Sequence, residues 1–258
     1  MYPWLHLGPA TISTYSLCFL AAYIVGGLVT YFEARRLGRA TEEVLQVALA
    51  ALGGGVIGAK LSMLIFLGPD AFIHNLDKLW FSGQAWTGGF FGGYLGVLLI
   101  KRIKGIRYST GDIFALGIPL AQAIGRLGNL LGGDPFGWRS NLPWALPDRY
   151  GTLRQPTALY ELILDLALFV VIWRLRNYMP RRGDLFTLYV VCYLSLRFAL
   201  DFTRSTEFDP QRIIGLTLVQ VLYAIALPAF AYKLWRSFSM ARAAGRVAAP
   251  MRVERQAA

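Results

Sequence analysis

The sequence comprises 258 residues, of which 55% are hydrophobic and only 16% are charged, and its mean hydropathy is +0.45. This composition excludes an ordinary soluble domain and indicates an integral membrane protein. The formal net charge of +11 is compatible with nucleic-acid binding, but the positions of the basic residues explain that charge in another way.

The apolar residues gather in seven runs, each near the length of about 20 residues that a helical membrane span requires. The runs are residues 12–32, 44–67, 86–100, 111–131, 158–173, 185–203 and 213–235. We therefore predict an all-α, polytopic integral membrane protein with about seven transmembrane helices. No small-residue cleavage site follows the first run, so we interpret it as a permanent span.

The basic residues alternate between the connections that join these runs. Seventeen lie in one set of connections and the C-terminal segment, and six lie in the other set. Because lysine and arginine are enriched in cytoplasmic loops, this asymmetry predicts an outer N-terminus and a cytoplasmic C-terminus. It divides the chain into a seven-span membrane domain, residues 1–235, and a basic cytoplasmic tail, residues 236–258. Membrane lipids are the expected partners of the tail, and no nucleic acid is expected.

One stretch combines a charge, an amide and five glycines at the end of an apolar run. Residues 125–137 read Gly-Arg-Leu-Gly-Asn-Leu-Leu-Gly-Gly-Asp-Pro-Phe-Gly. On a helix Arg126 and Asn129 share a face because they are three residues apart, and the glycines expose the backbone there to a ligand. An arginine inside a membrane span is energetically costly, so it indicates a functional site.

Polar residues from all seven runs share one depth. Each lies in the outer half of its own run: Tyr15, Lys60, Thr87, Arg126, Asn129, Tyr160, Glu161, Arg197 and Gln220. Structural polar residues would not sort by leaflet, so we predict one polar cavity that opens toward the outer leaflet. Arginine presents a planar fork that matches phosphate oxygens, so an anionic phospholipid headgroup is the expected ligand.

Simpler interpretations of these residues stay open. Tyr15 suits an interfacial aromatic belt, and Lys60 can extend its amine to the headgroups. Arg197 and Asp201, four residues apart on one helix face, can form an ion pair that serves only packing. Helix packing also explains the glycines that recur every four residues in the third run, Gly88, Gly92 and Gly96.

The cysteines and histidines carry no metal or disulfide pattern. Cys18 and Cys192 lie in different apolar runs and are interpreted as small buried hydrophobes. His6 and His74 are isolated from each other and from the cysteines. We therefore expect no metal and no cofactor.

These residues resemble the bacterial prolipoprotein diacylglyceryl transferases from Tyr15 to about Gln220. That family's signature is Gly-Arg-x-Gly-Asn followed by an acidic residue and Gly, and it is matched here by Gly125, Arg126, Gly128, Asn129, Asp134 and Gly137. Supporting matches are Tyr15, Arg154, Pro156, Tyr160, Glu161, Tyr193 and Arg197.

The resemblance implies transfer of the diacylglyceryl group of phosphatidylglycerol to the lipobox cysteine thiol of a prolipoprotein signal peptide. A thioether forms and glycerol phosphate leaves. Arg126 and Arg197 would be catalytic, because they hold the donor and stabilise the leaving phosphate. The residues implied to contact the substrate are Tyr15, Thr87, Gly88, Gly89, Asn129, Asp134, Gly137, Tyr160, Glu161 and Tyr193.

The sequence departs from the family pattern at three positions. In the family a histidine, proposed as the base or as a donor contact, precedes the Gly-Gly of the third span, and Thr87 stands there instead. An asparagine is replaced by Gly132, and the usual glutamate by Asp134. A threonine hydroxyl accepts a proton poorly near neutral pH, so Asp134, Glu161 and His74 are the alternative bases. A thiol with a pKa near 8.5 is partly ionised at pH 7, so loss of the base would slow the enzyme without abolishing it.

Two other functions remain open. A divergent paralogue would keep the lipid cavity but bind phospholipid only, or modify a different acceptor. A small transporter or flippase fits less well, because the polar residues stop at one leaflet and no inverted repeat is visible. The expected location is the bacterial cytoplasmic (inner) membrane, as a multi-pass protein.

Overall fold

The computed structural model describes residues 4–7, 10–67, 86–207 and 212–244. The chain forms two compact units, which we name the large unit (Met1–Glu33 with Ser109–Ala258) and the small unit (Ala34–Tyr108). Four helical stretches of the described chain are long and apolar enough to cross a membrane: Thr14–Arg36, Thr41–Leu61, Gly111–Gly132 and Asp184–Thr203. The predicted helical fold with membrane character is confirmed, whereas the seven spans and their orientation stay predictions.

The small unit pairs α2 (Thr41–Leu67) with α5 (Trp86–Ile103). A Cβ atom placed on Gly58 would lie 2.7 Å from the Cα atom of Gly92, and the reverse substitution would give the same distance. No side chain fits in that space, so the two backbones approach as closely as in membrane helix pairs built on small residues. The glycine stripe of the third predicted span therefore serves helix packing.

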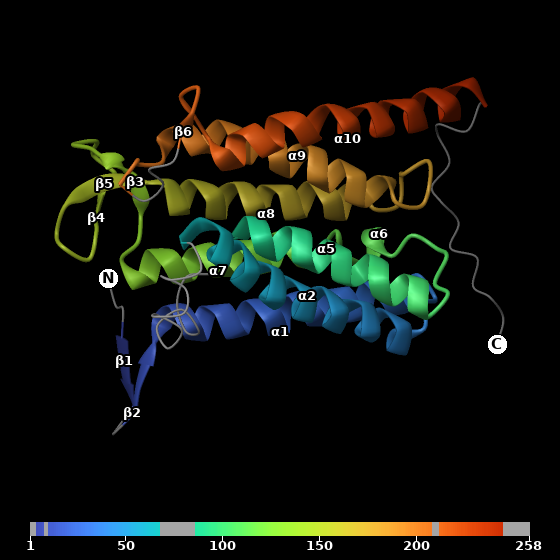
Figure 1. Cartoon of the computed structure of the whole chain (residues 1–258), viewed down its shortest axis with the longest axis horizontal. Coiled ribbons are helices and arrows are strands. Elements are labelled where there is room, and N and C mark those ends of the chain that lie inside the picture. The colour runs from blue at the N-terminus through green and yellow to red at the C-terminus, as the bar shows by residue number, and fades with distance from the viewer. Residues whose placement is uncertain (1–3, 8–9, 68–85, 208–211, 245–258) are drawn as a thin grey trace. The chain divides into compact units, whose positions relative to one another are not determined.

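The large unit contains α1 (Thr14–Arg36) and a row of four neighbouring helices, α7, α8, α9 and α10 (Figure 1). In this row α8 (Thr157–Leu175) packs on α7, α9 (Asp184–Leu200) packs on α8, and α10 (Leu218–Ala243) packs on α9. Van der Waals packing between apolar side chains stabilises these contacts. The core includes Leu116, Leu168, Ile172, Leu185, Tyr189, Val190 and Leu194.

The fourth predicted span is interrupted. It consists of α6 (Gly111–Phe114) and α7 (Gly117–Gly132), with Ala115 and Leu116 between them. Pro119 explains the interruption, because it has no N–H group to donate to the carbonyl of Ala115, four residues earlier.

The connection after α7 forms a small sheet. Helix α7 ends where Gly133 adopts a φ of 84°, which glycine tolerates. Three antiparallel strands follow in the order β3-β5-β4, with bounds Phe136–Arg139 for β3, Leu153–Pro156 for β5 and Leu146–Pro147 for β4. A Cβ atom on Gly137 would lie 2.7 Å from the Cβ atom of Gln155, so this strand pairing requires glycine there.

Two two-stranded hairpins, separate from this sheet, are also present in this helical fold. They are β1 (Trp4–Leu7) with β2 (Ala10–Ser13), and β6 (Arg212–Ile213) with β7 (Leu216–Thr217). The strands are at most four residues long, too short for a period-two pattern to stand out from their surroundings.

The last predicted span, residues 213–235, is shifted along the chain. Helix α10 begins at Leu218, because Thr217 and Gln220 form a capping box. The backbone N–H of Gln220 donates to Thr217 Oγ1 at 3.1 Å, and the backbone N–H of Thr217 donates to Gln220 Oε1 at 2.9 Å. The helix continues to Ala243, so the first part of the predicted tail, residues 236–258, is helical.

Candidate active site

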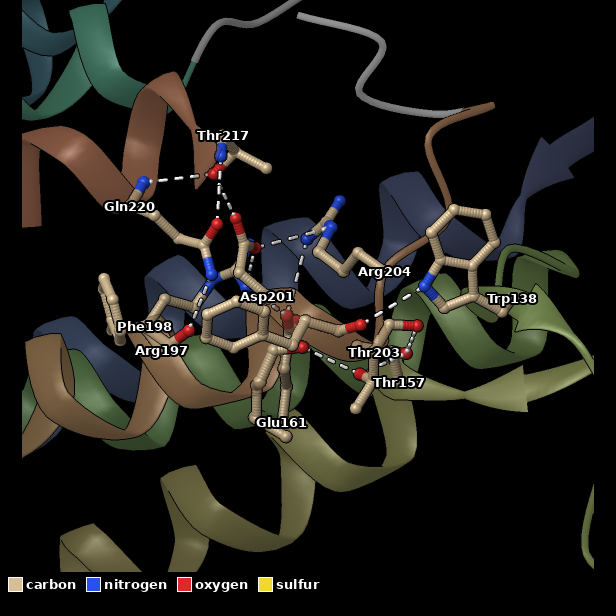
Figure 2. A network of polar contacts seen from close by, with 12 residues as sticks. Trp138, Thr157, Glu161, Arg197, Phe198, Asp201, Thr203, Arg204, Thr217 and Gln220 are labelled. Carbon is tan, nitrogen blue, oxygen red and sulfur yellow. Dashed lines mark hydrogen bonds and ion pairs between the residues drawn. The ribbon is translucent and has the colours of Figure 1, made fainter. Parts of the chain in front are cut away.

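Three arginines from two segments of the large unit converge on one buried carboxylate. Glu161, in the second turn of α8, is 3% exposed. Its Oε2 lies 2.6 Å from Nε of Arg126, and its Oε1 lies 3.2 Å from Nη1 of Arg197 and 3.4 Å from Nη1 of Arg204. Helices α7, α8 and α9 with the turn after it therefore bring three positive charges together at one point. Figure 2 shows two of them, Arg197 and Arg204, beside Glu161.

A second carboxylate binds the same nitrogen of Arg197, Nη1. Asp201 Oδ1 lies 2.5 Å from Arg197 Nη1, and Asp201 Oδ2 accepts a hydrogen bond of 2.5 Å from Thr217 Oγ1. Gln220, fully buried at the start of α10, donates from Nε2 to the carbonyl of Phe198 at 3.1 Å. Its side chain is occupied by these contacts (Figure 2), so Gln220 orients the Arg197 helix and does not line the cavity as the sequence pattern suggested.

A cavity of about 10 Å³ lies between these helices. Its lining residues are Arg126, Glu161, Leu164, Asp165, Tyr193, Leu196, Arg197 and Leu200. This volume corresponds to about one water molecule. The predicted meeting of Arg126 with Arg197, Glu161 and Tyr193 is therefore observed in the structure, in a space that side chains almost fill.

The glycine-rich end of α7 lies beside the first helix. A Cβ atom on Gly128 would lie 3.5 Å from Cδ2 of Tyr15, and one on Gly132 would lie 3.9 Å from Cβ of Tyr15. Tyr15 is 42% exposed and stacks on Phe19 with ring centroids 5.9 Å apart. Tyr15 therefore covers the face of α7 that the glycines leave free, next to the arginine site.

The end of this motif is held by an ion pair. Asp134 accepts from Arg149, with Nη2 lying 2.5 Å from Oδ1 and 2.6 Å from Oδ2. The amide N–H of Asp134 donates to the carbonyl of Asn129 at 2.9 Å, which closes the end of α7. Asp134 thus links the helix to the sheet connection.

An outer hollow of about 380 Å³ lies beside that pair. Its floor is Arg154, which is 4% exposed, binds Asp148 at 2.7 Å and also contacts Glu207. Burial alone would raise the pKa of Asp148, but hydrogen bonds from Arg154 and from two backbone amides outweigh it and lower that pKa. Both acidic and basic side chains line the hollow. Arg154, which supported the family resemblance, is held in ion pairs there and therefore has a structural role.

The remaining predicted site residues have the following surroundings within their own units. Tyr160 accepts a hydrogen bond of 2.6 Å from Trp144 Nε1 in the sheet connection. Gly88 and Gly89 belong to α5 of the small unit, where Gly89 faces the carbonyl of Gly55. Thr87 lies in the first turn of α5, and the position of its side chain is outside the described structure, as is His74.

Two residues of the site were missed from the sequence. Arg204 follows a predicted span and was counted as a connection charge, although its spacing of seven residues from Arg197 would place both on one face if the helix continued. Asp165 lies four residues after Glu161, a spacing that places both side chains on one face of a helix, so the sequence could have predicted it as a site residue.

The described residues hold no group of three or more His, Cys, Asp or Glu side chains suited to a metal ion. The polar groups that line the arginine cavity are guanidinium, carboxyl and phenol groups. Such a set can bind a phosphate and move a proton.

A family model described as prolipoprotein diacylglyceryl transferase matches residues 3–236. Three relatives named phosphatidylglycerol–prolipoprotein diacylglyceryl transferase share 31%, 37% and 34% identity with the chain, from Clostridioides difficile, Cutibacterium acnes and Bordetella avium respectively. The alignments cover 84%, 81% and 82% of this chain and 87%, 75% and 83% of those relatives. The resemblance seen in the sequence is confirmed, and the chain belongs to the prolipoprotein diacylglyceryl transferase family.

Proposed function

We propose that the protein transfers the diacylglyceryl group of phosphatidylglycerol to the lipobox cysteine of prolipoproteins, as the names of its relatives state for them. The observation that carries this proposal is the convergence of Arg126, Arg197 and Arg204 on Glu161. The reaction breaks a bond between a glyceryl carbon and a phosphate oxygen, and a cysteine sulfur takes the place of that oxygen.

The arginines supply what the leaving group needs. As the carbon–oxygen bond breaks, the phosphate changes from a singly charged diester to a doubly charged monoester. A guanidinium group donates two parallel hydrogen bonds to such oxygens, and fixed cations placed where charge develops stabilise a transition state. Glu161 and Asp201 hold the guanidinium groups in position before the lipid binds, so little reorganisation is required during the reaction.

Access to the site is from the side where the arginines are exposed. The side chains of Arg126 and Arg204 are 17% and 16% exposed, whereas that of Arg197 is 10% exposed. A headgroup therefore meets Arg126 and Arg204 first and enlarges the small cavity by displacing side chains. Arg126 and Arg197 remain the proposed catalytic pair, with Arg204 as a third phosphate ligand.

Further substrate contacts are proposed beside this pair of catalytic residues. Tyr15 of α1 and Asn129 of α7 would orient the lipid through hydrogen bonds. Supporting roles are proposed for Thr87, Gly88, Gly89, Asp134, Gly137, Tyr160, Glu161 and Tyr193.

We place the protein in the bacterial inner membrane as about seven spans, with the N-terminus outside and a basic cytoplasmic tail. The asymmetric distribution of lysine and arginine supports this orientation. The polar cavity of residues 1–235 then opens to the outer leaflet, where a secreted prolipoprotein presents its signal peptide. Phosphatidylglycerol and the peptide are the partners, and the reaction needs no cofactor.

The test is mass spectrometry of a synthetic lipobox peptide incubated with purified protein and phosphatidylglycerol in detergent micelles. The expected product carries one diacylglyceryl group on sulfur, and a peptide with serine in place of cysteine stays unmodified. Glycerol phosphate should appear in equal amount. An unmodified cysteine peptide, with protein that still binds phosphatidylglycerol, would instead support a divergent paralogue with another acceptor.

A further inference from the structure

The proposed reaction requires a group that takes the proton of the acceptor thiol. The position at which the family carries a histidine is Thr87 here, and a threonine hydroxyl is a poor proton acceptor. A positioned base contributes roughly 10²–10⁴-fold to a reaction of this kind. The carboxyl groups around the arginine site are therefore the other groups that could accept this proton.

Two of the acidic residues are already engaged with cations. Asp134 is bound through both oxygens by Arg149, and Glu161 is bound by Arg126, Arg197 and Arg204. Cations and hydrogen-bond donors stabilise the ionised carboxylate and weaken it as a base. Both oxygens of Asp134 accept hydrogen bonds from Arg149, and Glu161, which accepts one from Arg204, has two further guanidinium groups within 3.2 Å of its oxygens, so neither residue is suited to accept the proton.

Asp165 differs from both. It is 6% exposed, lies one turn after Glu161 on the same face of α8, and lines the cavity together with Arg126, Tyr193 and Arg197. No residue of the described structure donates a hydrogen bond to Asp165 or forms an ion pair with it. A carboxyl group buried without donors, at the wall of a cavity, is uncommon for a side chain that serves only packing.

Resting on the proposed function, we infer that Asp165 is the general base that accepts the proton of the prolipoprotein cysteine. The proton moves from sulfur to a carboxyl oxygen of Asp165, directly or through the one water for which the cavity has room. The thiolate then forms a bond to the glyceryl carbon, the carbon–oxygen bond to phosphate breaks, and its electron pair leaves with glycerol phosphate. The proton passes from Asp165 to solvent after product release.

The inference is tested with two acceptor peptides, one with the lipobox cysteine and one with selenocysteine in its place. A selenol is largely ionised at neutral pH and needs no base. Asp165→Asn should slow transfer to the cysteine peptide by about 10²–10⁴-fold, but transfer to the selenocysteine peptide by less than about threefold. Its rate with cysteine should rise about tenfold per pH unit until the thiol ionises, near pH 8.5.

Asp201→Asn is the matched comparison, because Asp201 is also a buried aspartate near Arg197 but accepts its hydrogen bonds from Arg197 and Thr217. Asp201→Asn should slow transfer to the two peptides by the same factor. Asp165→Glu keeps a carboxyl group and should retain transfer to cysteine within about tenfold, which guards against misfolding of Asp165→Asn.

If Asp165→Asn slowed transfer to both peptides equally, or did not slow transfer to the cysteine peptide, Asp165 would not be the base. A wild-type protein that modifies neither peptide would instead overturn the proposed function, and the base with it.

Discussion

Replacement of Glu161 by glutamine tests whether the carboxylate holds the arginine site together. The substitution keeps the size of the side chain and removes the negative charge shared by Arg126, Arg197 and Arg204 at 2.6, 3.2 and 3.4 Å. Each pair is worth about 5–6 kcal/mol at these distances and an effective dielectric constant near 20, and desolvation of the buried carboxylate offsets much of the total. Removal of one partner from a buried ion pair typically costs about 3–5 kcal/mol, and we expect a loss of free energy of unfolding in that range.

The measurement is the midpoint of thermal unfolding in detergent. A loss of about 3–5 kcal/mol lowers the midpoint by roughly 6–20 °C in a chain of this size. Glu33→Gln is the matched control, because Glu33 is equally buried, at 3% exposed, but its partner Arg176 is 25% exposed and lies 3.3 Å away. A partly solvated ion pair contributes about 1 kcal/mol or less to the free energy of unfolding, so the midpoint of Glu33→Gln should shift little. Equal shifts in the two variants would refute the view that three arginines depend on Glu161.

Three further predictions concern chemistry, the missing histidine and the sheet connection. Arg126→Lys should lower the transfer rate about 10²–10³-fold in the mass-spectrometric assay, because an ammonium group lacks the planar fork, whereas Arg176→Lys should stay within a few-fold of wild type. Thr87→His should leave activity intact or raise it, and inactivation would show that this position is not that of a lost base. The pKa of Asp148 is lowered in the fold, so its bond to Arg154 stabilises the connection above pH 3.8 and is lost as the pH falls through the lowered pKa. Proteolysis of the connection should therefore rise below pH 3.8 in wild type, and at neutral pH already in Asp148→Asn.

The positions of the helices followed from the lengths of the apolar runs, because a membrane span needs a minimum number of apolar residues. That Arg126 and Arg197 are paired with a carboxylate could be predicted for a related reason, since a buried cation in such a run requires compensation. The strands of the 136–156 sheet could not be predicted, because their short length leaves no periodic pattern. The interruption before Pro119 was within reach of the sequence, since proline removes a helical hydrogen bond.

The partners of the arginines were harder to predict than the arginines themselves. Depth along a helix can be read from sequence, but the rotation of one helix against another cannot, and that rotation decides which carboxylate faces which cation. Gln220 shows the consequence, because it lies at the expected depth but is occupied by the capping box of α10. Asp165 shows the reverse, since it lies one turn deeper than the expected layer but lines the cavity.

The balance of charge in the site links the two proposals. Arg126, Arg197 and Arg204 carry three positive charges, and Glu161, Asp201 and Asp165 carry three negative charges when all are ionised. When Asp165 takes the thiol proton, one cation is left without a balancing carboxylate. In the next step the phosphate gains its second negative charge, so the cation becomes available when the leaving group requires it. A base at Asp165 would thus strengthen the arginine site for bond cleavage, whereas a base outside the cavity would leave the balance unchanged.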